Sequence, residues 1–428
     1  MNIRITGAPK GGAVQAIPSK SAAHRIMIAA TMSGIDLTGS LDGLSKDITA
    51  TKECLLAIRE HEKKRTRCDR AVTDRDSLPH GPSAQLFCGE SGSTLRFLIP
   101  LAGVLGVQAD LYCEGRLPDR PMEPFLDQLR EHGCVVTERN PKKLRGRLLG
   151  GDFALPGNIS SQYVTGLLMA LPLAEETSRI LVEGPLQSRP YIDLTLEILA
   201  KAGIRVTESR DEESTVFEIA GGQQYCLAET ELANIEGDWS NGAFWLVMDA
   251  MNRQRGLAGI ECAGLDPASR QGDKAVAAII AEIEAKDAGP DSDEASRLVE
   301  IDVSDIPDLV PAIAVLAVSR VPGTMTHITG AGRLRFKESD RLRTVTETLN
   351  TLGADITEEK EGLLIPGSGS LHGGQVSSCT DHRIVMMAAA AACITEGEVA
   401  IRDAGAVEKS YPGFFEDYKM LGGSWEIL

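Results

Sequence analysis

The stretch Lys337-Glu338-Ser339-Asp340-Arg341-Leu342-Arg343 opens a segment with helical periodicity and organises the rest of this 428-residue chain. The spacing predicts that Lys337, Asp340 and Arg341 share one side of a helix, at i, i+3 and i+4. The amino end of a helix attracts anions, so the added cations suggest a phosphate or carboxylate ligand. Glu338 in the same turn suggests proton transfer. Taken alone, the seven residues fit a solvated turn with local ion pairs better.

Similar polar turns recur along the chain and favour a functional site. Six segments open with helix-capping residues and continue with small apolar residues, at intervals of about 70 residues. They begin at Ser19-Lys20-Ser21, Glu90-Ser91-Gly92-Ser93-Thr94, Ser160-Ser161-Gln162, Asp238-Trp239-Ser240-Asn241, Ile306-Pro307-Asp308 and Thr380-Asp381-His382-Arg383. Repeats of this length are supersecondary modules rather than turns of a solenoid.

A second series ends a helix at glycine and then enters a strand, at Gly133, Gly203, Gly353 and Gly422. Glycine suits the left-handed position where a helix stops. Together the two series divide the chain into six units, each expected to hold two helices and several short strands. Three units make one body of common domain size, so we predict two similar α/β domains: residues 18–235, and residues 1–17 with 236–428.

Composition limits the partners and the compartment. The net charge of −17 argues against non-specific nucleic-acid binding. The longest apolar run, residues 384–394, is too short to span a bilayer. Nine cysteines contain no CxxC pair, so neither a zinc site nor a disulfide framework is indicated. We expect a cytoplasmic protein without nucleic-acid or membrane partners. Residues 62–82 and 285–296 are predicted to be solvated loops or hairpins.

The motifs of several common chemistries are missing. The sequence contains no GxxxxGK[ST], no GxGxxG after a strand, no GxSxG and no HExxH. The remaining chemistry is acid–base and electrostatic catalysis on an anionic substrate, for which we expect neither a metal nor a cofactor. Cations and hydroxyls at the repeated helix starts suit a small ligand with several anionic groups, bound where the two domains meet.

Nine motifs carry a family resemblance. They are Pro18 to Arg25, Glu90 to Arg96, Asp119-Arg120-Pro121-Met122, Ser160-Ser161-Gln162, Ser188-Arg189-Pro190-Tyr191, Gln271-Gly272-Asp273, Ile306-Pro307-Asp308, Arg335 to Arg341 and Asp381-His382-Arg383. In this order they resemble the 5-enolpyruvylshikimate-3-phosphate synthase family, from about residue 3 to the end. The resemblance implies two similar domains, each of three βαβαββ units (an inside-out α/β barrel), with the active site in the interdomain cleft.

The resemblance also implies a reaction and its residues: the enolpyruvyl group of phosphoenolpyruvate passes to the 5-hydroxyl of shikimate 3-phosphate. The residues implied to bind shikimate 3-phosphate are Lys20, Ser21, Arg25, Ser160, Ser161, Gln162, Ser188, Tyr191, Asp308 and Lys337. Those implied to bind phosphoenolpyruvate are Lys20, Gly92, Arg120, Gln162, Arg341, His382, Arg383 and Lys409. Three are implied to be catalytic. Asp308 holds and deprotonates the attacking hydroxyl, Glu338 protonates the C3 methylene and takes the proton back, and Lys20 touches both ligands.

Two alternatives stay open. The related transferase acting on UDP-N-acetylglucosamine carries a reactive cysteine before its own Arg-Pro, whereas Asp119 precedes Arg120 here and Cys113 lies in a predicted strand. A non-catalytic anion-binding protein on the same fold is the other alternative, but a pure anion binder gains nothing from buried carboxylates. We also expect a monomer, and sensitivity to the family's phosphonate inhibitor glyphosate, because Gly92 leaves room for a ligand.

Overall fold

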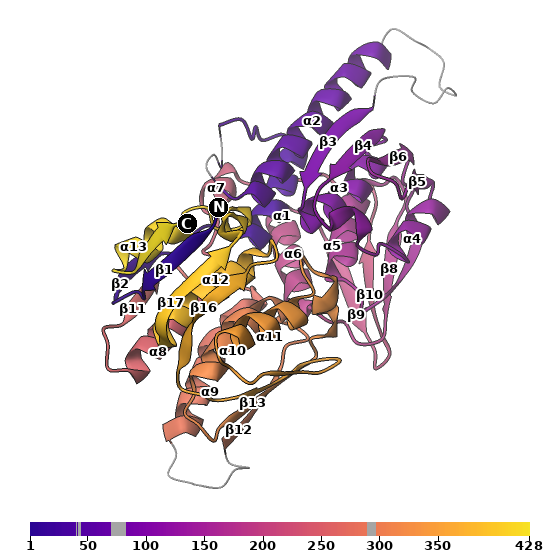
Figure 1. The fold of residues 1–428 in the computed structure, drawn as a ribbon. Coiled ribbons are helices and arrows are strands. Elements are labelled where there is room, and N and C mark those ends of the chain that lie inside the picture. The colour runs from indigo at the N-terminus through magenta and orange to yellow at the C-terminus, as the bar shows by residue number, and fades with distance from the viewer. Residues whose placement is uncertain (40, 42–43, 70–82, 289–296) are drawn as a thin grey trace. The chain divides into compact units, whose positions relative to one another are not determined.

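The computed structural model describes the whole chain except residues 40, 42–43, 70–82 and 289–296 (Figure 1). The described residues form two compact units. Unit 1 combines Met1–Ser19 with Glu236–Leu428, and unit 2 is Lys20–Ile235. Each unit has a large apolar core of its own. No helix among the described residues is long and apolar enough to cross a bilayer.

Unit 2 contains two complete copies of a strand–helix–strand–helix–strand–strand module. The first is β3 (Ala84–Gly89), α3 (Gly92–Val104), β4 (Ala109–Cys113), α4 (Phe125–Glu131), β5 (Cys134–Val136) and β6 (Lys142–Gly146). The second is β7 (Asp152–Pro156), α5 (Ser161–Ala170), β8 (Ser178–Glu183), α6 (Arg189–Lys201), β9 (Val206–Arg210) and β10 (Ser214–Ile219). Their sheet orders, β3-β4-β6-β5 and β7-β8-β10-β9, are the same, and in each sheet only the first pair is parallel.

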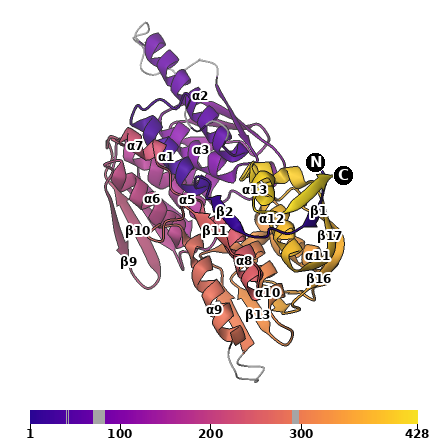
Figure 2. The ribbon, with the colours of Figure 1, turned by 90° about the vertical axis from the view of Figure 1, so that its left-hand side faces the viewer.

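Unit 1 contains two further complete modules. One is β12 (Leu298–Asp302), α10 (Val310–Ser319), β13 (Met325–Thr329), α11 (Arg341–Thr351), β14 (Thr357–Glu358) and β15 (Leu363–Pro366). The other is β16 (Leu371–Ser377), α12 (His382–Ala391), β17 (Thr395–Arg402), α13 (Phe414–Met420) and β18 (Ser424–Ile427), completed by β1 (Ile3–Gly7). Strand β1 lies between β17 and β18, so the two chain termini are neighbours, as Figures 1 and 2 show.

In the remaining two modules the described residues form fewer strands. In unit 1, β2 (Gly12–Gln15) pairs in parallel with β11 (Ile260–Ala263), beside α8 (Trp239–Gln254) and α9 (Val276–Ala288). In unit 2, the described part consists of α1 (Lys20–Met32) and α2 (Lys46–Asp69), and the short helix α7 (Glu229–Ala233) closes the unit. The predicted two-body α/β fold is therefore confirmed, and each predicted polar turn is followed by a helix: α1, α3, α5, α8, α10 or α12.

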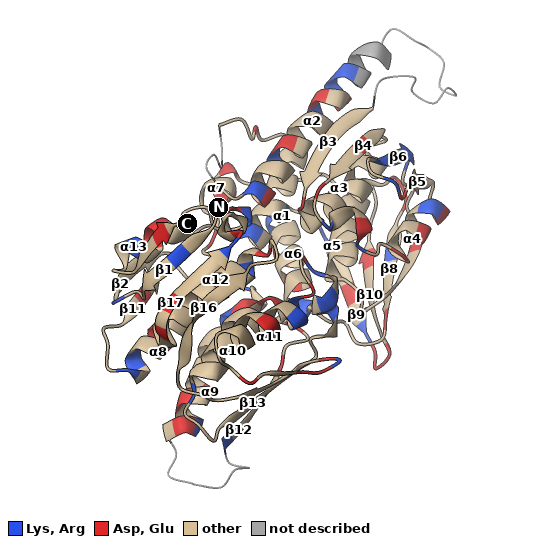
Figure 3. Ribbon diagram, in the orientation of Figure 1, with Lys and Arg blue, Asp and Glu red and all other residues tan. Residues whose placement is uncertain are grey.

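These six helices form the inner layer of the two units. Almost every residue of α10 and α12 is buried, and their sequences consist mainly of alanine, valine, isoleucine and methionine. Within unit 1, α8, α10 and α12 contact one another, and within unit 2, α5 contacts α1 and α3. Buried residues alternate with more exposed residues along strands β3 and β8, as expected for sheets with one covered face. Figure 3 shows the inner helices largely free of charged residues except near their ends.

The predicted helix stops are confirmed. Gly133, Gly203, Gly353 and Gly422 have φ values of 92°, 76°, 102° and 86°, and they follow α4, α6, α11 and α13. At such positive φ a side chain would be strained, which is why glycine recurs there.

Two sequence-based predictions are wrong. Helix α11 begins at Arg341 rather than Lys337, because the Asp340 side chain caps it by accepting from the Arg343 N–H. Lys337 instead follows the 3-10 helix Gly332–Phe336 in extended backbone. Residues 62–69 continue α2 rather than forming a loop, with Glu60 and Lys64 paired one turn apart at 2.7 Å. Residues 285–288 likewise belong to α9, while 70–82 and 289–296 lie outside the described residues.

Candidate active site

The predicted ligand residues lie on the connections that leave the parallel strand pairs. Ligands of open α/β sheets bind outside the carboxyl ends of the strands, where helix N-termini also lie. The connections carry Gly92 after β3, Arg120 after β4, Ser160 to Gln162 after β7, Ser188 and Tyr191 after β8, Asp308 after β12, Lys337 to Arg341 after β13, His382 and Arg383 after β16, and Lys409 after β17. Repetition of one module therefore places each side chain at the same edge of its sheet.

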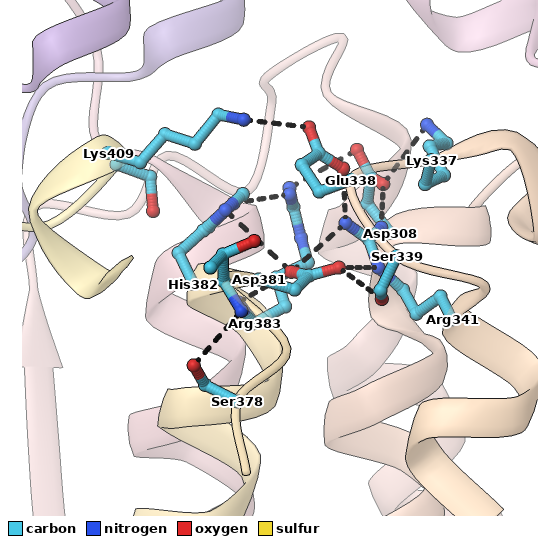
Figure 4. A network of polar contacts seen from close by, with 12 residues as sticks. Asp308, Lys337, Glu338, Ser339, Arg341, Ser378, Asp381, His382, Arg383 and Lys409 are labelled. Atoms are coloured by element: carbon cyan, nitrogen blue, oxygen red, sulfur yellow. Dashed lines mark hydrogen bonds and ion pairs between the residues drawn. The ribbon is translucent and has the colours of Figure 1, made fainter. Parts of the chain in front are cut away.

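In unit 1, Asp308 lies at the centre of an ion-pair network (Figure 4). Its Oδ1 is 3.3 Å from Lys337 Nζ and 2.9 Å from Arg341 Nη1, and its Oδ2 is 3.2 Å from Arg383 Nη2. Burial alone would raise the pKa of Asp308, but the three cations hold that pKa well below its usual range. The carboxylate is therefore ionised at neutral pH. Burial lowers the pKa of Lys337, although Asp308 opposes this effect.

Glu338 lies between two cations of the same network. Its Oε2 accepts a hydrogen bond from Arg341 Nη2 at 2.8 Å, and its Oε1 is 3.6 Å from Lys409 Nζ. The side chain is 11% exposed, so it is mostly buried but still accessible. Arg341, the first residue of α11, thus binds both predicted catalytic carboxylates, Asp308 and Glu338.

The carboxylate of Asp381 holds Arg341 in place, and the sequence did not identify Asp381 as a site residue. The fully buried carboxylate accepts from Arg341 Nε at 3.0 Å and from Ser339 Oγ at 3.0 Å. It also caps α12 by accepting from the Arg383 N–H at 3.0 Å. Burial opposes the charge of Arg341, but its acidic neighbours, Asp381 first among them, raise its pKa above the usual value. The available signal was an acidic N-cap directly before a His-Arg pair.

His382 and Asp273 are buried members of the same unit. His382 Nε2 lies 2.7 Å from Arg383 Nη1, so the histidine contacts a predicted ligand cation. Asp273 belongs to the motif Gln271-Gly272-Asp273, but the family resemblance implies no role for it. Its carboxylate accepts a hydrogen bond from Ser240 Oγ, and burial, together with the charge of Asp308, raises its pKa to about 7.

In unit 2, Gly92, Arg96, Arg120 and Gln162 form a group that we call the Gly92 cradle. A Cβ atom at Gly92 would lie 2.6 Å from Arg96 Nη1 and 3.1 Å from Arg120 Nη1. Gln162 Oε1 accepts from Arg96 Nη1 at 2.8 Å. Two guanidinium groups therefore approach the first turn of α3 closely because glycine leaves the space. Cations beside a helix N-terminus suit an anion.

Arg25 joins the predicted shikimate-phosphate residues of unit 2. Its guanidinium donates to the carbonyl oxygens of Ser21 at 2.6 Å and Tyr191 at 3.0 Å, and to Thr195 Oγ1 at 2.8 Å. Burial lowers the pKa of Arg25 to about 10, which leaves it charged at neutral pH. The start of α1 is therefore bound directly to the start of α6.

The other predicted residues of unit 2 lie at helix starts. Lys20 Nζ is 3.0 Å from Asp47 Oδ2, a partner for which no sequence motif gave a signal. Ser160 caps α5 by accepting from the Gln162 N–H, and Ser161 is the first residue of that helix. Ser188 lies directly before α6, in the left-handed conformation with a φ of 57°. The predicted site residues are thus divided between the two units.

Repeated α/β modules in two units, with Lys20 and Arg383 at inner helix starts and two carboxylates joined through one arginine, are the arrangement expected of the two-domain enolpyruvyl transferases. A sequence profile of the EPSP synthase (3-phosphoshikimate 1-carboxyvinyltransferase) family matches residues 6–418. The chain belongs to this family. Its members transfer a carboxyvinyl group to 3-phosphoshikimate, a step of the shikimate pathway of aromatic amino acid biosynthesis.

Relatives along the full length agree with the profile. The chain is 40% identical to the 3-phosphoshikimate 1-carboxyvinyltransferase of Clostridium kluyveri, with 97% of each chain covered, and 35% identical to that of Methanocorpusculum labreanum, with 99% covered. The fold matches an EPSP synthase structure from Acinetobacter baumannii with a TM-score of 0.70, at 20% identity over 100% of this chain and 99% of the other. These matches do not favour the alternative acceptor UDP-N-acetylglucosamine.

Proposed function

We propose that the chain transfers the enolpyruvyl group of phosphoenolpyruvate to the 5-hydroxyl of shikimate 3-phosphate and releases phosphate. The observation that supports this most directly is the network of unit 1, in which an ionised Asp308 and the largely buried Glu338 share Arg341. A carboxylate to accept a proton and a second carboxyl group to supply one are what this addition requires.

The proposed reaction proceeds through a tetrahedral intermediate. Glu338 protonates C3 of phosphoenolpyruvate, which builds positive charge at C2. Asp308 takes the proton of the 5-hydroxyl while the hydroxyl oxygen bonds to C2. The bond from C2 to the phosphate oxygen then breaks, and Glu338 takes a proton back from C3. Arg341 and Lys409, which flank Glu338, stabilise the anionic groups near the reacting carbon.

The ligand residues divide into two proposed pockets. The Gly92 cradle, with Arg341, His382, Arg383 and Lys409, binds phosphoenolpyruvate. The residues around Arg25, with Ser160, Ser161, Ser188 and Lys337, bind shikimate 3-phosphate. Lys20 contacts both ligands, and its pairing with Asp47 holds the ammonium group at the start of α1. Glyphosate, as an anionic phosphonate, is proposed to compete for the first pocket.

We further propose that the site is completed in a cleft between domain 18–235 and the domain formed by 1–17 and 236–428. This proposal is supported by the distribution of the predicted catalytic residues, because Lys20 belongs to unit 2 and Asp308 to unit 1. Closure on both ligands would exclude water and align the reactants. Small-angle scattering tests this proposal: the radius of gyration should fall when both ligands are added, and an unchanged value contradicts closure.

The enzyme is also proposed to act as a monomer in the cytoplasm. The cysteines whose side chains are described are all free thiols, which suits a reducing compartment. Light scattering coupled to gel filtration measures the mass directly, and a dimer at working concentrations contradicts the first part.

A phosphate-release assay tests the proposed reaction. The protein is incubated with phosphoenolpyruvate and either shikimate 3-phosphate or UDP-N-acetylglucosamine. We expect turnover only with shikimate 3-phosphate. Release with the nucleotide sugar alone, or binding of both substrates without any turnover, rejects the proposal in favour of one of the two alternatives.

A further inference from the structure

Four buried polar side chains connect three helices of unit 2. His24 Nδ1 lies 2.7 Å from Thr51 Oγ1, and Thr51 Oγ1 lies 2.6 Å from Thr94 Oγ1. Thr94 Oγ1 donates to Ser91 Oγ at 2.7 Å. All four residues are at most 1% exposed, so the chain runs through the interior from α1 across α2 to the start of α3. We call it the hydroxyl chain.

The hydroxyl chain ends at the helix turn that forms the Gly92 cradle. Ser91 is the N-cap of α3, and its Oγ accepts from both the Thr94 N–H and the Thr94 hydroxyl. Gly92 follows directly. An N-cap fixes the direction in which the first N–H groups of a helix point. The hydroxyl chain thus acts on the turn that faces Arg96 and Arg120.

The other end of the hydroxyl chain lies beside the Lys20–Asp47 ion pair. His24 is one helical turn after Lys20, and Thr51 is one turn after Asp47. The two pairs therefore form successive rungs between α1 and α2, at 3.0 Å and 2.7 Å. A side chain proposed to contact both substrates is in this way connected through the interior to the Gly92 cradle.

The direction of each hydrogen bond follows from counting protons. The single hydroxyl proton of Thr94 goes to Ser91, so Thr94 accepts from Thr51. The single hydroxyl proton of Thr51 is then used, so Thr51 accepts from His24. His24 must carry its proton on Nδ1. Its buried Nε2 has no hydrogen-bond partner among the described residues, and a bare lone pair is tolerated there better than an unpaired N–H.

We propose that the hydroxyl chain positions the first turn of α3 relative to Lys20, with Thr51 as the central positioning residue and His24 held as the Nδ1–H tautomer. In the part of the chain that the structure describes, the Thr51 hydroxyl pairs with His24 and Thr94, neither of which is a proposed ligand residue, so Thr51 acts on the first turn of α3 through Thr94 and Ser91. The kinetic part of this inference rests on the proposed function, whereas the tautomer does not.

The tautomer is tested on the wild-type protein by NMR with ¹⁵N-labelled histidine. The His24 signals are assigned by their loss in His24→Gln. At pH 7 we expect a neutral ring, since burial lowers the pKa of His24 to about 3, with the proton on Nδ1. A proton on Nε2 overturns the proposal, whatever the enzyme activity is.

The positioning role is tested with Thr51→Val, which removes the hydroxyl but keeps the shape of the side chain. We expect the KM for phosphoenolpyruvate to rise about tenfold, while the Kd for shikimate 3-phosphate changes less than about twofold. Thr51→Ser should restore the KM because it restores the hydroxyl. A wild-type protein without phosphate release refutes the proposed function, and the NMR result still decides the tautomer.

The matched control is Thr31→Val, in the same helix as His24. Thr31 is also buried, but its hydroxyl donates only to the Met27 carbonyl oxygen of its own helix. It should lower the melting temperature as much as Thr51→Val without changing the KM for phosphoenolpyruvate. Equal KM changes in the two variants, or failure of Thr51→Ser to restore the KM, overturn the positioning role.

Discussion

The carboxylates of Asp308 and Glu338 differ in their surroundings, and this suggests different roles. Asp308 is shared among three cations, whereas Glu338 lies between Arg341 and Lys409. We expect Glu338→Gln and Asp308→Ala each to lower kcat by about 10²- to 10⁴-fold, because each removes a group that moves a proton in the reaction. Shikimate 3-phosphate binding, measured by calorimetry, should be largely retained.

Glu347→Gln is the control for these variants, since Glu347 is an exposed residue of α11 whose carboxylate pairs with Arg343 one turn away at 2.7 Å. Its kcat should equal that of the wild type. Loss of binding with little change in kcat in the Glu338 or Asp308 variants contradicts the catalytic assignment.

At Gly92 we predict the effect of a substitution from the space that its side chain would occupy rather than from its charge. In Gly92→Ala the new methyl group lies 2.6 Å from Arg96 Nη1, so a guanidinium must move out of the Gly92 cradle. We expect the KM for phosphoenolpyruvate to rise about tenfold and inhibition by glyphosate to weaken by more than that. Steady-state kinetics measure both. Gly413→Ala, where a Cβ meets nothing within 4 Å, should leave both unchanged. A fully active enzyme at saturating glyphosate in the wild type contradicts the assigned pocket.

The raised pKa of Asp273 leads us to predict that the stability of the protein depends on pH. Its pKa rises from an ordinary value of 3.8 to about 7 in the folded protein. Between these values the folded protein holds a proton that the unfolded chain has lost, so stability falls as the pH rises toward 7. Asp273→Asn stays neutral and still accepts from Ser240. The free energy of unfolding of the variant, relative to wild type, should increase by about 2 kcal/mol between pH 5 and pH 8 in urea titrations. A pH-independent difference contradicts the raised pKa.

At the scale of elements, the repeated glycines that end α6 and α11 make a matched pair. Gly203 and Gly353 both have positive φ, but a Cβ at Gly203 meets only Cys226 Cβ at 3.9 Å, whereas at Gly353 it lies 2.5 Å from His372 Cδ2. We expect Gly203→Ala to cost about 1 kcal/mol from backbone strain, and Gly353→Ala at least twice as much. Denaturant midpoints give the comparison. Equal losses would mean that His372 moves away freely.

The start of α11 shows where element prediction from sequence fails. Lys337, Asp340 and Arg341 have helical spacing, and this spacing alone places Lys337 in the first turn. The cap decides otherwise, since the Asp340 carboxylate accepts from the Arg343 N–H and the backbone of Lys337 is extended rather than helical. Local hydrogen bonding to a short acidic side chain outweighs the periodic pattern there. The six inner helices were predictable because polar residues typical of helix starts come just before each apolar run.

For the whole molecule, the position of β1 makes a prediction about unit 1. Strand β1 lies between β17 and β18, and β18 has no other partner strand among the described residues. A fragment of residues 236–428 should therefore fail to unfold cooperatively. Joining Leu428 through a short Asn-Gly turn to residues 1–17 should restore cooperative unfolding, because Ile3 already pairs with Ile427 in an antiparallel register. Circular dichroism during thermal unfolding makes the measurement. Equal behaviour of the two fragments contradicts the role of β1.

The sequence by itself determined the modular repeat, the two-body α/β fold, the existence of the six inner helices and the family, because polar helix starts, apolar periodicity and glycine stops are local signals that survive without tertiary context. Only the tertiary structure decided which charges meet. Asp47 and Thr51 carry no local signal, and the helix-capping signal of Asp381 does not reveal its partner Arg341. These residues gain their partners because the fold brings together positions that are 27 to 43 residues apart. Burial also sets the protonation states of Asp308 and Asp273, since the cost of an unpaired charge depends on what surrounds it in three dimensions.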